Sequence, residues 1–325
     1  MNIRPRRMRA HPALRNLMRE NTLTPDDLIA PLFVIDSADA RTPIASMPGQ
    51  ARLNIPELIK EARHLAGLGV KTLALFPAID ERFKSPDAAH AWQADNLNFR
   101  AARALKEALP DVLLMGDIAL DPYSSDGHDG LVDKKTGEIL NDATLEALVK
   151  QGLASAKAGF DILGPSDMMD GRVGALRAAL ESEGHPNTVI MSYTAKYASA
   201  FYGPFRDALA SAPKKGDKKT YQMDFANARE ALTEAKLDEA EGADILMVKP
   251  GLAYLDVIYR LRQATTLPIA AYNVSGEYAM VKAAHERGWV DGERVMLETL
   301  MAFKRAGSDV ILSYFAREAA ELLHQ

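Results

Sequence analysis

The sequence of 325 residues contains no cysteine. This absence excludes disulfide bonds, a thiolate nucleophile, and any zinc or iron–sulfur site that depends on cysteine ligands. The chain also lacks an apolar run of the roughly 18 residues that a transmembrane helix needs. No secretory apolar segment follows the first methionine, so we expect a cytoplasmic protein without a membrane partner.

A strong excess of either charge is missing as well. The formal net charge is −5, which gives no reason to expect nucleic acid or an anionic membrane surface as a partner. Residues 1–20 are rich in positive charge and carry six arginines. Such a segment suits nucleic acid, a transit peptide, an acidic neighbouring subunit or plain solvation, and composition leaves these alternatives open.

Eight short apolar segments, bounded by turn residues, recur along the chain. They cover residues 28–35, 72–77, 112–120, 160–166, 188–193, 244–250, 267–276 and 308–316. Apolar residues run through them almost without interruption, as in strands that are buried on both faces. Segments with helical periodicity lie between most of them, and three of these, each ending at a glycine, are 54–69, 141–159 and 224–242.

Eight strands alternating with helices predict one α/β domain, a (β/α)8 TIM barrel over residues 28–325, preceded by an arm of residues 1–27. An open, doubly wound sheet is the structural alternative, but no G-x-G-x-x-G motif follows a strand. Active sites of such barrels lie at the carboxyl ends of the strands. We therefore expect the functional side chains at the ends of the apolar segments.

Two lysines occupy matching places in this pattern. Lys249 ends the apolar segment "DILMVKP", and Lys196 closely follows "TVIMSY". Their strands are neighbours in the predicted barrel, so the two ammonium groups should meet at its mouth and lower each other's pKa. A neutral lysine attacks a ketone to form a Schiff base. A single lysine here is more simply explained as a salt-bridged strand cap, whereas the pair favours catalysis.

Charged residues near the expected mouth suit a carboxylated substrate. Arg206 offers a planar fork for a carboxylate. The loop 214–224 contains Lys218 and Gln222 and could close over the same anion as a lid, although a solvated basic loop is the simpler alternative. The segment 116–130 gathers Asp117, Asp121, Asp126, His128 and Asp129. These side chains favour Mg²⁺, Ca²⁺, Mn²⁺ or K⁺, unless they form only a polar turn.

Several stretches together resemble the porphobilinogen synthase family, also called 5-aminolevulinate dehydratase. They are "RPRRMR", "MSYTAKYASAFYGPFRDA", "ILMVKPGLAYLD" and "YNVSGEY", and the resemblance continues through "AFKRAGSDVILSYFA" to cover nearly the whole chain. It implies a lyase that condenses two molecules of 5-aminolevulinate to porphobilinogen with loss of two waters, early in tetrapyrrole (heme and chlorophyll) biosynthesis. It also implies a TIM barrel whose arm wraps a neighbouring subunit, in a homo-octamer more often than a hexamer.

The resemblance assigns Lys249 to the Schiff base with the first substrate and Lys196 to the second substrate. It also implies residues that bind the substrate carboxylates or line the cavity: Ser275 and Tyr314 for the first substrate, Arg206, Lys218 and Gln222 for the second, and Phe205 and Tyr272 for the wall. Asp117 and Ser166 are further candidate substrate-binding residues. The strand pattern suggests them, because each lies at the carboxyl end of an apolar segment.

The chain departs from the best-known members of the family in its metal ligands. Zinc-dependent relatives carry three cysteines after the third strand, and here those positions hold Ala119, Asp121 and Asp129, so zinc is not expected. The chain resembles the aspartate-containing branch, in which an activating Mg²⁺ lies away from the catalytic centre. Glu234 matches the carboxylate that anchors this ion through waters, and a solvated helix face explains it equally well. A monovalent cation such as K⁺ stays open, and no organic cofactor is expected.

Two other functions compete with this interpretation. A class I aldolase on the same fold needs one catalytic lysine and leaves the second unexplained. A non-catalytic barrel that serves as a scaffold predicts no amine with a lowered pKa and no covalent trapping by a ketone. The sequence also leaves open whether a neutral Lys196 or a metal-bound hydroxide acts as the catalytic base.

Overall fold

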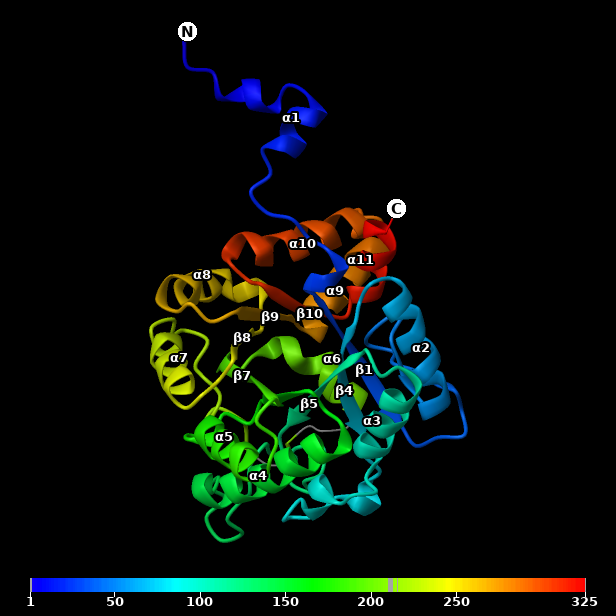
Figure 1. Cartoon of the computed structure of the whole chain (residues 1–325), viewed down its shortest axis with the longest axis vertical. Helices are drawn as coiled ribbons and strands as arrows, with labels where there is room; N and C mark the ends of the chain where they lie inside the picture. The colour runs from blue at the N-terminus through cyan, green and yellow to red at the C-terminus, as the bar shows by residue number, and fades with distance from the viewer. Residues whose placement is uncertain (1, 210–212, 215, 325) are drawn as a thin grey trace.

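The computed structural model describes residues 2–209, 213–214 and 216–324. Its centre is a barrel of eight parallel strands (Figure 1). In chain order they are β1 (Leu28–Ile35), β4 (Thr72–Ala78), β5 (Leu113–Ile118), β6 (Ile162–Pro165), β7 (Val189–Lys196), β8 (Ile245–Lys249), β9 (Ile269–Asn273) and β10 (Val310–Ser313). Each strand pairs with the next, and β10 pairs with β1, where Leu28 faces Ile311. The predicted closed barrel is confirmed, and the open sheet is excluded.

The strands are shorter than their apolar segments where a helix begins early. The segment 267–276 yields a strand that ends at Asn273, because a helix begins at Ser275. The segment 308–316 likewise ends as a strand at Ser313, and a helix begins at Ala316. Apolar character continues from strand into helix in both places, so hydrophobicity alone does not mark the boundary.

Helices surround the barrel and cover its outer face (Figure 1). They are α2 (Ile55–Gly67), α3 (Leu97–Ala108), α4 (Asn141–Ala158), α5 (Arg172–Ser182), α7 (Glu230–Ala240), α8 (Leu255–Ala264), α9 (Ser275–Glu286), α10 (Gly292–Ala306) and α11 (Ala316–Leu323). Asn54 caps α2 by accepting a hydrogen bond of 3.1 Å from the backbone N–H of Glu57. In the described part of the chain, no helix is both long and apolar enough to span a bilayer.

One predicted helix begins later than its periodicity indicates. The segment 224–242 was expected to be helical throughout, but α7 begins only at Glu230. Asp224 holds a turn instead, because its Oδ1 accepts a hydrogen bond of 2.8 Å from the N–H of Ala226. Asn227 donates to the Glu230 carboxylate over 2.9 Å. Short polar side chains that bond their local backbone compete with helix formation in this way.

Some short elements have no counterpart in the sequence pattern. The strands β2 (Arg41–Pro43) and β3 (Ala51–Leu53) form an antiparallel pair, and β3 extends the sheet beside the end of β1. After β7 the chain forms the 3₁₀ helix η5 (Ala200–Tyr202) and the helix α6 (Gly203–Leu209), which contains Phe205 and Arg206. These elements are too short for periodicity to reveal.

A cluster of aromatic rings fills part of the barrel interior. The rings of Phe33 and Tyr314 stack with their centroids 5.8 Å apart, and those of Phe76 and Phe205 meet edge to face at 5.2 Å. The hydroxyls of Tyr272 and Tyr314 form a hydrogen bond of 2.9 Å. Each aromatic side chain removes a large apolar area from water, so this cluster also fixes the floor beneath the barrel mouth.

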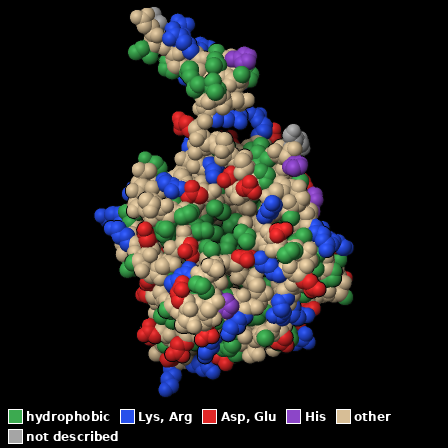
Figure 2. Space-filling view, viewed as in Figure 1, with side chains coloured by type: hydrophobic (Ala, Val, Ile, Leu, Met, Phe, Trp, Pro, Cys, Tyr) green, Lys and Arg blue, Asp and Glu red, His purple; other side chains and the backbone are tan. Residues whose placement is uncertain are grey.

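The N-terminal arm lies outside the barrel. Figure 1 shows it projecting away from the domain, and residues 2–20 are exposed throughout. The arm contains the short helices η1 (Pro5–Arg9) and α1 (Pro12–Leu17). Figure 2 shows basic and hydrophobic side chains side by side on it, and the exposed apolar residues include Ile3, Leu14 and Leu17. The chain rejoins the barrel at Asp27, whose carboxylate lies 2.8 Å from the Lys304 ammonium.

Candidate active site

The two lysines meet at the ends of adjacent strands. Lys196 and Lys249 are partners in the register of β7 and β8, and only 5% and 7% of their surfaces are exposed. The register shifts between Ser192 and Ala195 just before this pair. Both side chains line one cavity of about 30 Å³, which has room for about two water molecules. Two like charges are thus concentrated in a very small volume.

Lys249 points into a cage of aromatic rings. Its Nζ lies 4.6 Å from the ring centre of Tyr272, and the rings of Tyr193, Tyr202 and Phe205 lie 5.1, 5.2 and 5.1 Å away. Ring faces attract an ammonium group, but burial and then the charge of Lys196 outweigh this attraction and lower the pKa of Lys249 to about 7. A large fraction of this amine is therefore neutral at physiological pH.

Lys196 is held by oxygen atoms on its other side. Its Nζ donates to the backbone carbonyl of Ser166 and lies 3.6 Å from Oδ2 of Asp129. Asp129 is almost completely buried. Burial disfavours its carboxylate, but Lys196 and then Lys218 outweigh that effect and hold the pKa of Asp129 below its usual range. Lys196 therefore has a counter-ion within 4 Å, whereas Lys249 forms no ion pair with any residue that the structure describes.

Asp117 lines the same cavity as the two lysines. It belongs to β5, two strands from Lys196 around the barrel. Burial raises the pKa of its carboxyl group, and the charges of Lys249 and Lys196 only partly oppose this shift. A buried carboxyl group in the same cavity as two amines is placed to exchange protons with groups bound there.

Two of the three residues expected to bind the second carboxylate already contact aspartates of the protein. The Nζ of Lys218 lies 3.0 Å from Oδ1 of Asp129 and 3.3 Å from Oδ2 of Asp121. Gln222 donates to Oδ2 of Asp129 over 3.4 Å. Arg206 lines the cavity too, and among the described residues it forms no ion pair. Asp129 thus holds the place that a substrate carboxylate would take between Lys218 and Gln222.

These contacts join the expected lid to the aspartate-rich loop. The backbone N–H of Lys214 donates to the carbonyl of Asp126 over 3.1 Å. Further along, the hydroxyl of Tyr221 lies 3.0 Å from Nδ1 of His128. Lys215, which also belongs to the expected lid 214–224, lies outside the described residues. The described part of the segment is therefore folded against the mouth rather than extended into solvent.

Ser275 and Tyr314, expected to bind the first carboxylate, do not line the small cavity. They are linked to Lys249 through its aromatic cage instead. The backbone N–H of Phe205 donates to Oγ of Ser275 over 3.0 Å, and the Tyr314 hydroxyl bonds that of Tyr272 over 2.9 Å. The rings of Phe205 and Tyr272 both belong to the aromatic cage around the Lys249 ammonium. Ser275 and Tyr314 therefore lie behind the aromatic cage of Lys249, whereas Arg206, Lys218 and Gln222 line the small cavity itself.

Glu234 lies away from the lysines, on α7, and lines a separate cavity of about 760 Å³. Burial raises the pKa of Glu234, although Arg172 opposes the shift. Mg²⁺ keeps several waters and needs only one or two carboxylates, so Glu234 fits a hydrated ion. Asp121 and Asp129 do not fit a resident metal in this arrangement, because the Lys218 ammonium already bridges them. The described residues contain no group of three or more metal-binding side chains.

Sequence reasoning missed two residues of the site. Tyr202 lines the cavity, and its hydroxyl donates to the carbonyls of Tyr197 and Lys249 over 2.8 and 3.1 Å. The only hint of this role in the sequence is that Tyr202 lies three positions before Phe205, in "AFYGPF". Glu277 lies buried behind the mouth. An acidic residue in the first turn of a helix is so common that it gives no specific signal.

Comparisons with known proteins agree across nearly the whole chain. The sequence model of the delta-aminolevulinic acid dehydratase family matches residues 2–322. The chloroplastic delta-aminolevulinic acid dehydratase of Glycine max is 55% identical over 321 residues, covering 98% of this chain and 77% of that protein. The delta-aminolevulinic acid dehydratase of Bradyrhizobium diazoefficiens is 53% identical over 322 residues, covering 99% of this chain and 91% of that protein.

A solved structure agrees equally well. The crystal structure of delta-aminolevulinic acid dehydratase (porphobilinogen synthase) from Toxoplasma gondii ME49, in complex with the reaction product porphobilinogen, is similar with a TM-score of 0.98. The two sequences are 53% identical, and the match covers 99% of this chain and 92% of the other. The chain belongs to the delta-aminolevulinic acid dehydratase (porphobilinogen synthase) family of lyases, as its sequence motifs predict.

Proposed function

We propose that the protein condenses two molecules of 5-aminolevulinate to porphobilinogen, with loss of two water molecules, through Schiff bases at Lys249 and Lys196. The observation that carries this proposal is the pairing of two buried lysines at the ends of β7 and β8. The porphobilinogen bound to the Toxoplasma gondii relative supports the same reaction.

Lys249 suits the first Schiff base. With a pKa of about 7, roughly half of its amine is neutral at pH 7. The neutral nitrogen attacks the ketone carbon of one substrate, and the resulting carbinolamine loses the ketone oxygen as water to give the imine. The imine carbon is more electrophilic than the ketone, and the protons on the neighbouring carbon are more acidic. The first substrate is thereby activated for bond formation.

Lys196 suits the second substrate, because it is adjacent to Lys249 and keeps a counter-ion in Asp129. The second ketone oxygen also leaves as water, either through an imine at Lys196 or directly. One C–C and one C–N bond then join the two substrates. Any bond between a lysine nitrogen and a substrate carbon breaks before the product leaves, so both amines stay on the protein and two waters are lost in all.

Asp117 acts as the acid and base that transfers protons between these steps. It lines the cavity with both lysines, and burial raises the pKa of its carboxyl group. We assign to it both the protonation of a leaving hydroxyl and the removal of a proton from the activated carbon, because it lines the cavity that both amines enter. A neutral lysine nitrogen is the alternative base, and this assignment needs no metal in the mouth.

The substrate carboxylates are bound on two sides of the lysine pair. Ser275 and Tyr314 bind the first carboxylate through hydroxyl groups beside the aromatic cage. The second carboxylate is bound by Arg206, Lys218 and Gln222. For this, Lys218 and Gln222 must give up their contacts with the Asp129 carboxylate and contact the substrate carboxylate instead. A cavity of about 30 Å³ cannot hold two substrates, so the lid opens for binding and closes again over the second carboxylate.

Three further features of the proposal lie outside the mouth. Glu234 would hold a hydrated Mg²⁺ at its own cavity, where the ion neutralises the acidic surface of α7; K⁺ is a second candidate cation. Arm contacts between copies would build a homo-oligomer, with an octamer favoured over a hexamer. The expected cytoplasmic location stays a prediction, and the Glycine max relative is named as chloroplastic.

The test combines trapping with a product assay. The protein is incubated with 5-aminolevulinate, reduced with borohydride and digested, and the adducts are mapped by mass spectrometry. Pyrrole formation is measured in parallel, with and without EDTA. We expect adduct at Lys249, with or without Lys196, together with pyrrole. The Lys249→Arg variant keeps the positive charge but should form neither adduct nor pyrrole.

The alternatives give different results in the same test. A class I aldolase would trap a ketone at one lysine without forming pyrrole. A scaffold would give no adduct at either lysine, and that result would refute the proposal. Loss of activity in EDTA, restored by Mg²⁺ in the wild type but not in Glu234→Gln, would support the metal site at α7.

A further inference from the structure

A buried carboxylate with no part in the chemistry above joins two strand ends of the barrel mouth. Glu277, in the first turn of α9, is only 1% exposed. Its Oε2 accepts hydrogen bonds from the Asn273 side chain over 2.8 Å and from the Val274 N–H over 3.1 Å. Its Oε1 accepts from the N–H of Leu252 over 2.9 Å. The end of β9 is thus tied to the segment that follows β8.

The chain of hydrogen bonds continues to a third strand. The Oδ1 of Asn273 accepts from the hydroxyl of Ser313 over 2.8 Å, at the end of β10. The same Ser313 oxygen accepts from the backbone N–H of Phe315 over 3.1 Å. Both side chains are completely buried. A continuous polar chain, Glu277–Asn273–Ser313, therefore connects the ends of β8, β9 and β10.

These three strand ends present the residues assigned to the first substrate. Lys249 lies three positions before Leu252, Ser275 two positions after Asn273, and Tyr314 directly after Ser313. The residues assigned to the second substrate belong to other elements. Lys196 ends β7, and Arg206 lies on α6. The polar chain therefore supports one half of the mouth and not the other.

Only a carboxylate satisfies this arrangement. Three donors converge on its two oxygens, and each would be left unsatisfied in the protein interior without an acceptor. A glutamine of the same shape would turn an NH₂ group toward one of these donors. Burying a charge is costly, and burial indeed raises the pKa of Glu277 to about 7. The hydrogen bonds from Asn273, Leu252 and Val274 oppose this shift, so about half of the Glu277 side chains are ionised at pH 7.

We infer that Glu277 is a positioning residue for the first substrate, which holds Lys249, Ser275 and Tyr314 at the separation that Schiff-base formation needs. This inference rests on the proposed function, because it uses the assignment of these three residues to one substrate. Glu277 does not touch the substrate. It acts by fixing the backbone on both sides of the attacking amine, where small displacements reduce reactivity strongly.

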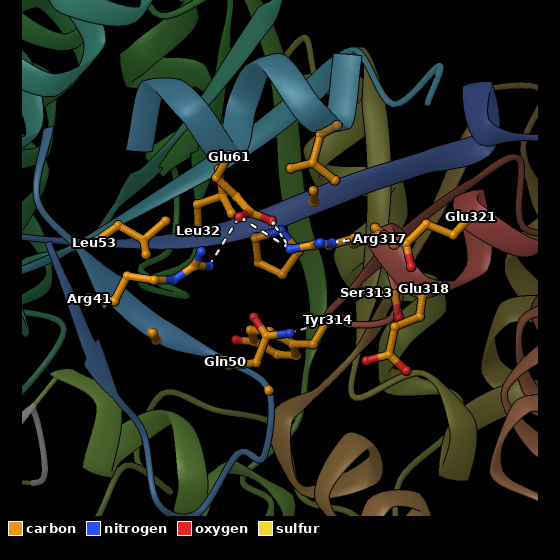
Figure 3. A pocket seen from close by; sticks show the side chains of 16 residues that line it. Leu32, Arg41, Gln50, Leu53, Glu61, Ser313, Tyr314, Arg317, Glu318 and Glu321 are labelled. Atoms are coloured by element: carbon orange, nitrogen blue, oxygen red, sulfur yellow. Dashed lines mark hydrogen bonds and ion pairs between the residues drawn. The ribbon is translucent and has the colours of Figure 1, made fainter. Parts of the chain in front are cut away.

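The test compares Glu277→Gln with a matched variant of another buried carboxylate. Figure 3 shows Glu61 in a cavity between α2 and α11, bonded to Arg41 and Arg317 over 3.1 Å each. Glu61→Gln also removes a buried negative charge and also weakens several hydrogen bonds. Ser313 and Tyr314 line the same cavity, but the hydrogen bonds of Glu61 go to Arg41 and Arg317 and not to the polar chain. Thermal unfolding measures the stability of both variants, and levulinate, the substrate without its amino group, probes the Schiff base at Lys249 under reduction.

We expect Glu277→Gln to lower the rate of adduct formation at Lys249 at least tenfold, and kcat with it. Glu61→Gln should stay within about twofold of the wild type at equal loss of thermal stability. Ser313→Ala removes only the far end of the polar chain and should lower the adduct rate in the same direction by a smaller factor. It serves as the test if Glu277→Gln fails to fold.

Two results would overturn the inference. An adduct rate in Glu277→Gln or Ser313→Ala equal to that of the wild type would exclude a positioning role. An equal fall in Glu61→Gln would mean that the loss follows stability alone. A wild-type protein that forms no adduct at Lys249 would instead refute the proposed function, so the two failures are distinguishable.

Discussion

Lys249 shows how a single residue is prepared for reaction by its surroundings. Four aromatic rings lie within 5.2 Å of its Nζ, and its strand partner Lys196 brings a second positive charge close by. Lys196, in contrast, lies 3.6 Å from the carboxylate of Asp129. Two lysines in matching positions thus differ. Lys196 has a carboxylate as its counter-ion, whereas burial lowers the pKa of Lys249 and favours its uncharged form.

The pH dependence of Schiff-base formation follows from this environment. Only the neutral amine attacks a ketone, and the pKa of Lys249 is lowered to about 7. The rate of levulinate trapping at Lys249 should therefore rise about tenfold per pH unit below pH 7 and level off above it. Cyanoborohydride reduction between pH 5.5 and 9 measures it. The exposed Lys60 is the control and should carry no adduct, while a half-maximal rate above pH 9 would contradict the lowered pKa.

Arg206 should determine affinity more than turnover. It lines the cavity without an ion partner among the described residues, so its guanidinium is available to a substrate carboxylate. A hydrogen bond to a charged group contributes about 1.5–3 kcal/mol, so Arg206→Ala should raise KM roughly 10- to 100-fold. Arg206→Lys keeps the charge without the fork and should recover part of this loss. The control is Arg82→Ala, at an exposed site, and equal KM values in both alanine variants would exclude the assignment.

At the scale of elements, the mouth is built where two irregular segments meet. The aspartate-rich loop after β5 and the described part of segment 214–224 are joined by the contacts of Lys218 with Asp121 and Asp129. In the proposed function a substrate carboxylate would replace Asp129 beside Lys218, so the buried ammonium would keep a partner throughout. Leaving it unpaired would be strongly destabilising.

The Asp121→Asn substitution should loosen the lid. It removes one of the two carboxylates that hold Lys218, whereas Asp126→Asn changes the same loop at a position where only the backbone carbonyl contacts the lid. We expect amide hydrogen exchange in residues 218–223 to accelerate about tenfold in Asp121→Asn, equivalent to roughly 1.4 kcal/mol. Exchange in Asp126→Asn should match the wild type. Equal exchange in both variants would show that the ion pair does not hold the lid.

The barrel and the arm differ sharply at the scale of the whole molecule. The barrel buries its apolar residues in a continuous core, whereas residues 2–20 are exposed along their entire length. Ile3, Leu14 and Leu17 keep apolar side chains in water beside the arginines of the arm. Exposed apolar side chains in such a concentration mark an interaction surface, which supports the proposed contact with a second copy.

Deleting residues 2–20 should therefore reduce the size of the assembly. The capped turn at Thr24–Asp27 and its ion pair with Lys304 are retained in this variant, so the barrel should remain folded. Analytical ultracentrifugation measures the mass, and circular dichroism measures the fold. The double substitution Leu14→Ser and Leu17→Ser should act in the same direction by removing apolar contact area. A deleted protein with the mass of the wild-type assembly would exclude the arm from the subunit contacts.

The sequence determined the barrel and the family. Near-continuous apolar runs such as residues 28–35 are typical of strands covered on both faces, and β1 occupies the same residues. Asn54 and Gly159 mark helix ends through local hydrogen bonding and a left-handed φ of +102°. These signals depend only on residues close together in the sequence, so they can be recognised without the tertiary structure.

Only the tertiary structure decided which charges meet. Lys218 lies 97 positions from Asp121 and 89 from Asp129, and no periodicity relates residues so far apart. Glu277 likewise accepts a hydrogen bond from the backbone N–H of Leu252, which lies 25 positions away in the sequence. Such contacts depend on how loops close over the strand ends, and their strength depends on burial, which exists only once the barrel has formed. For that reason the sequence identified the two lysines by their place after strands, and named Asp121 and Asp129 as candidate metal ligands, but did not reveal that these aspartates pair with lysines.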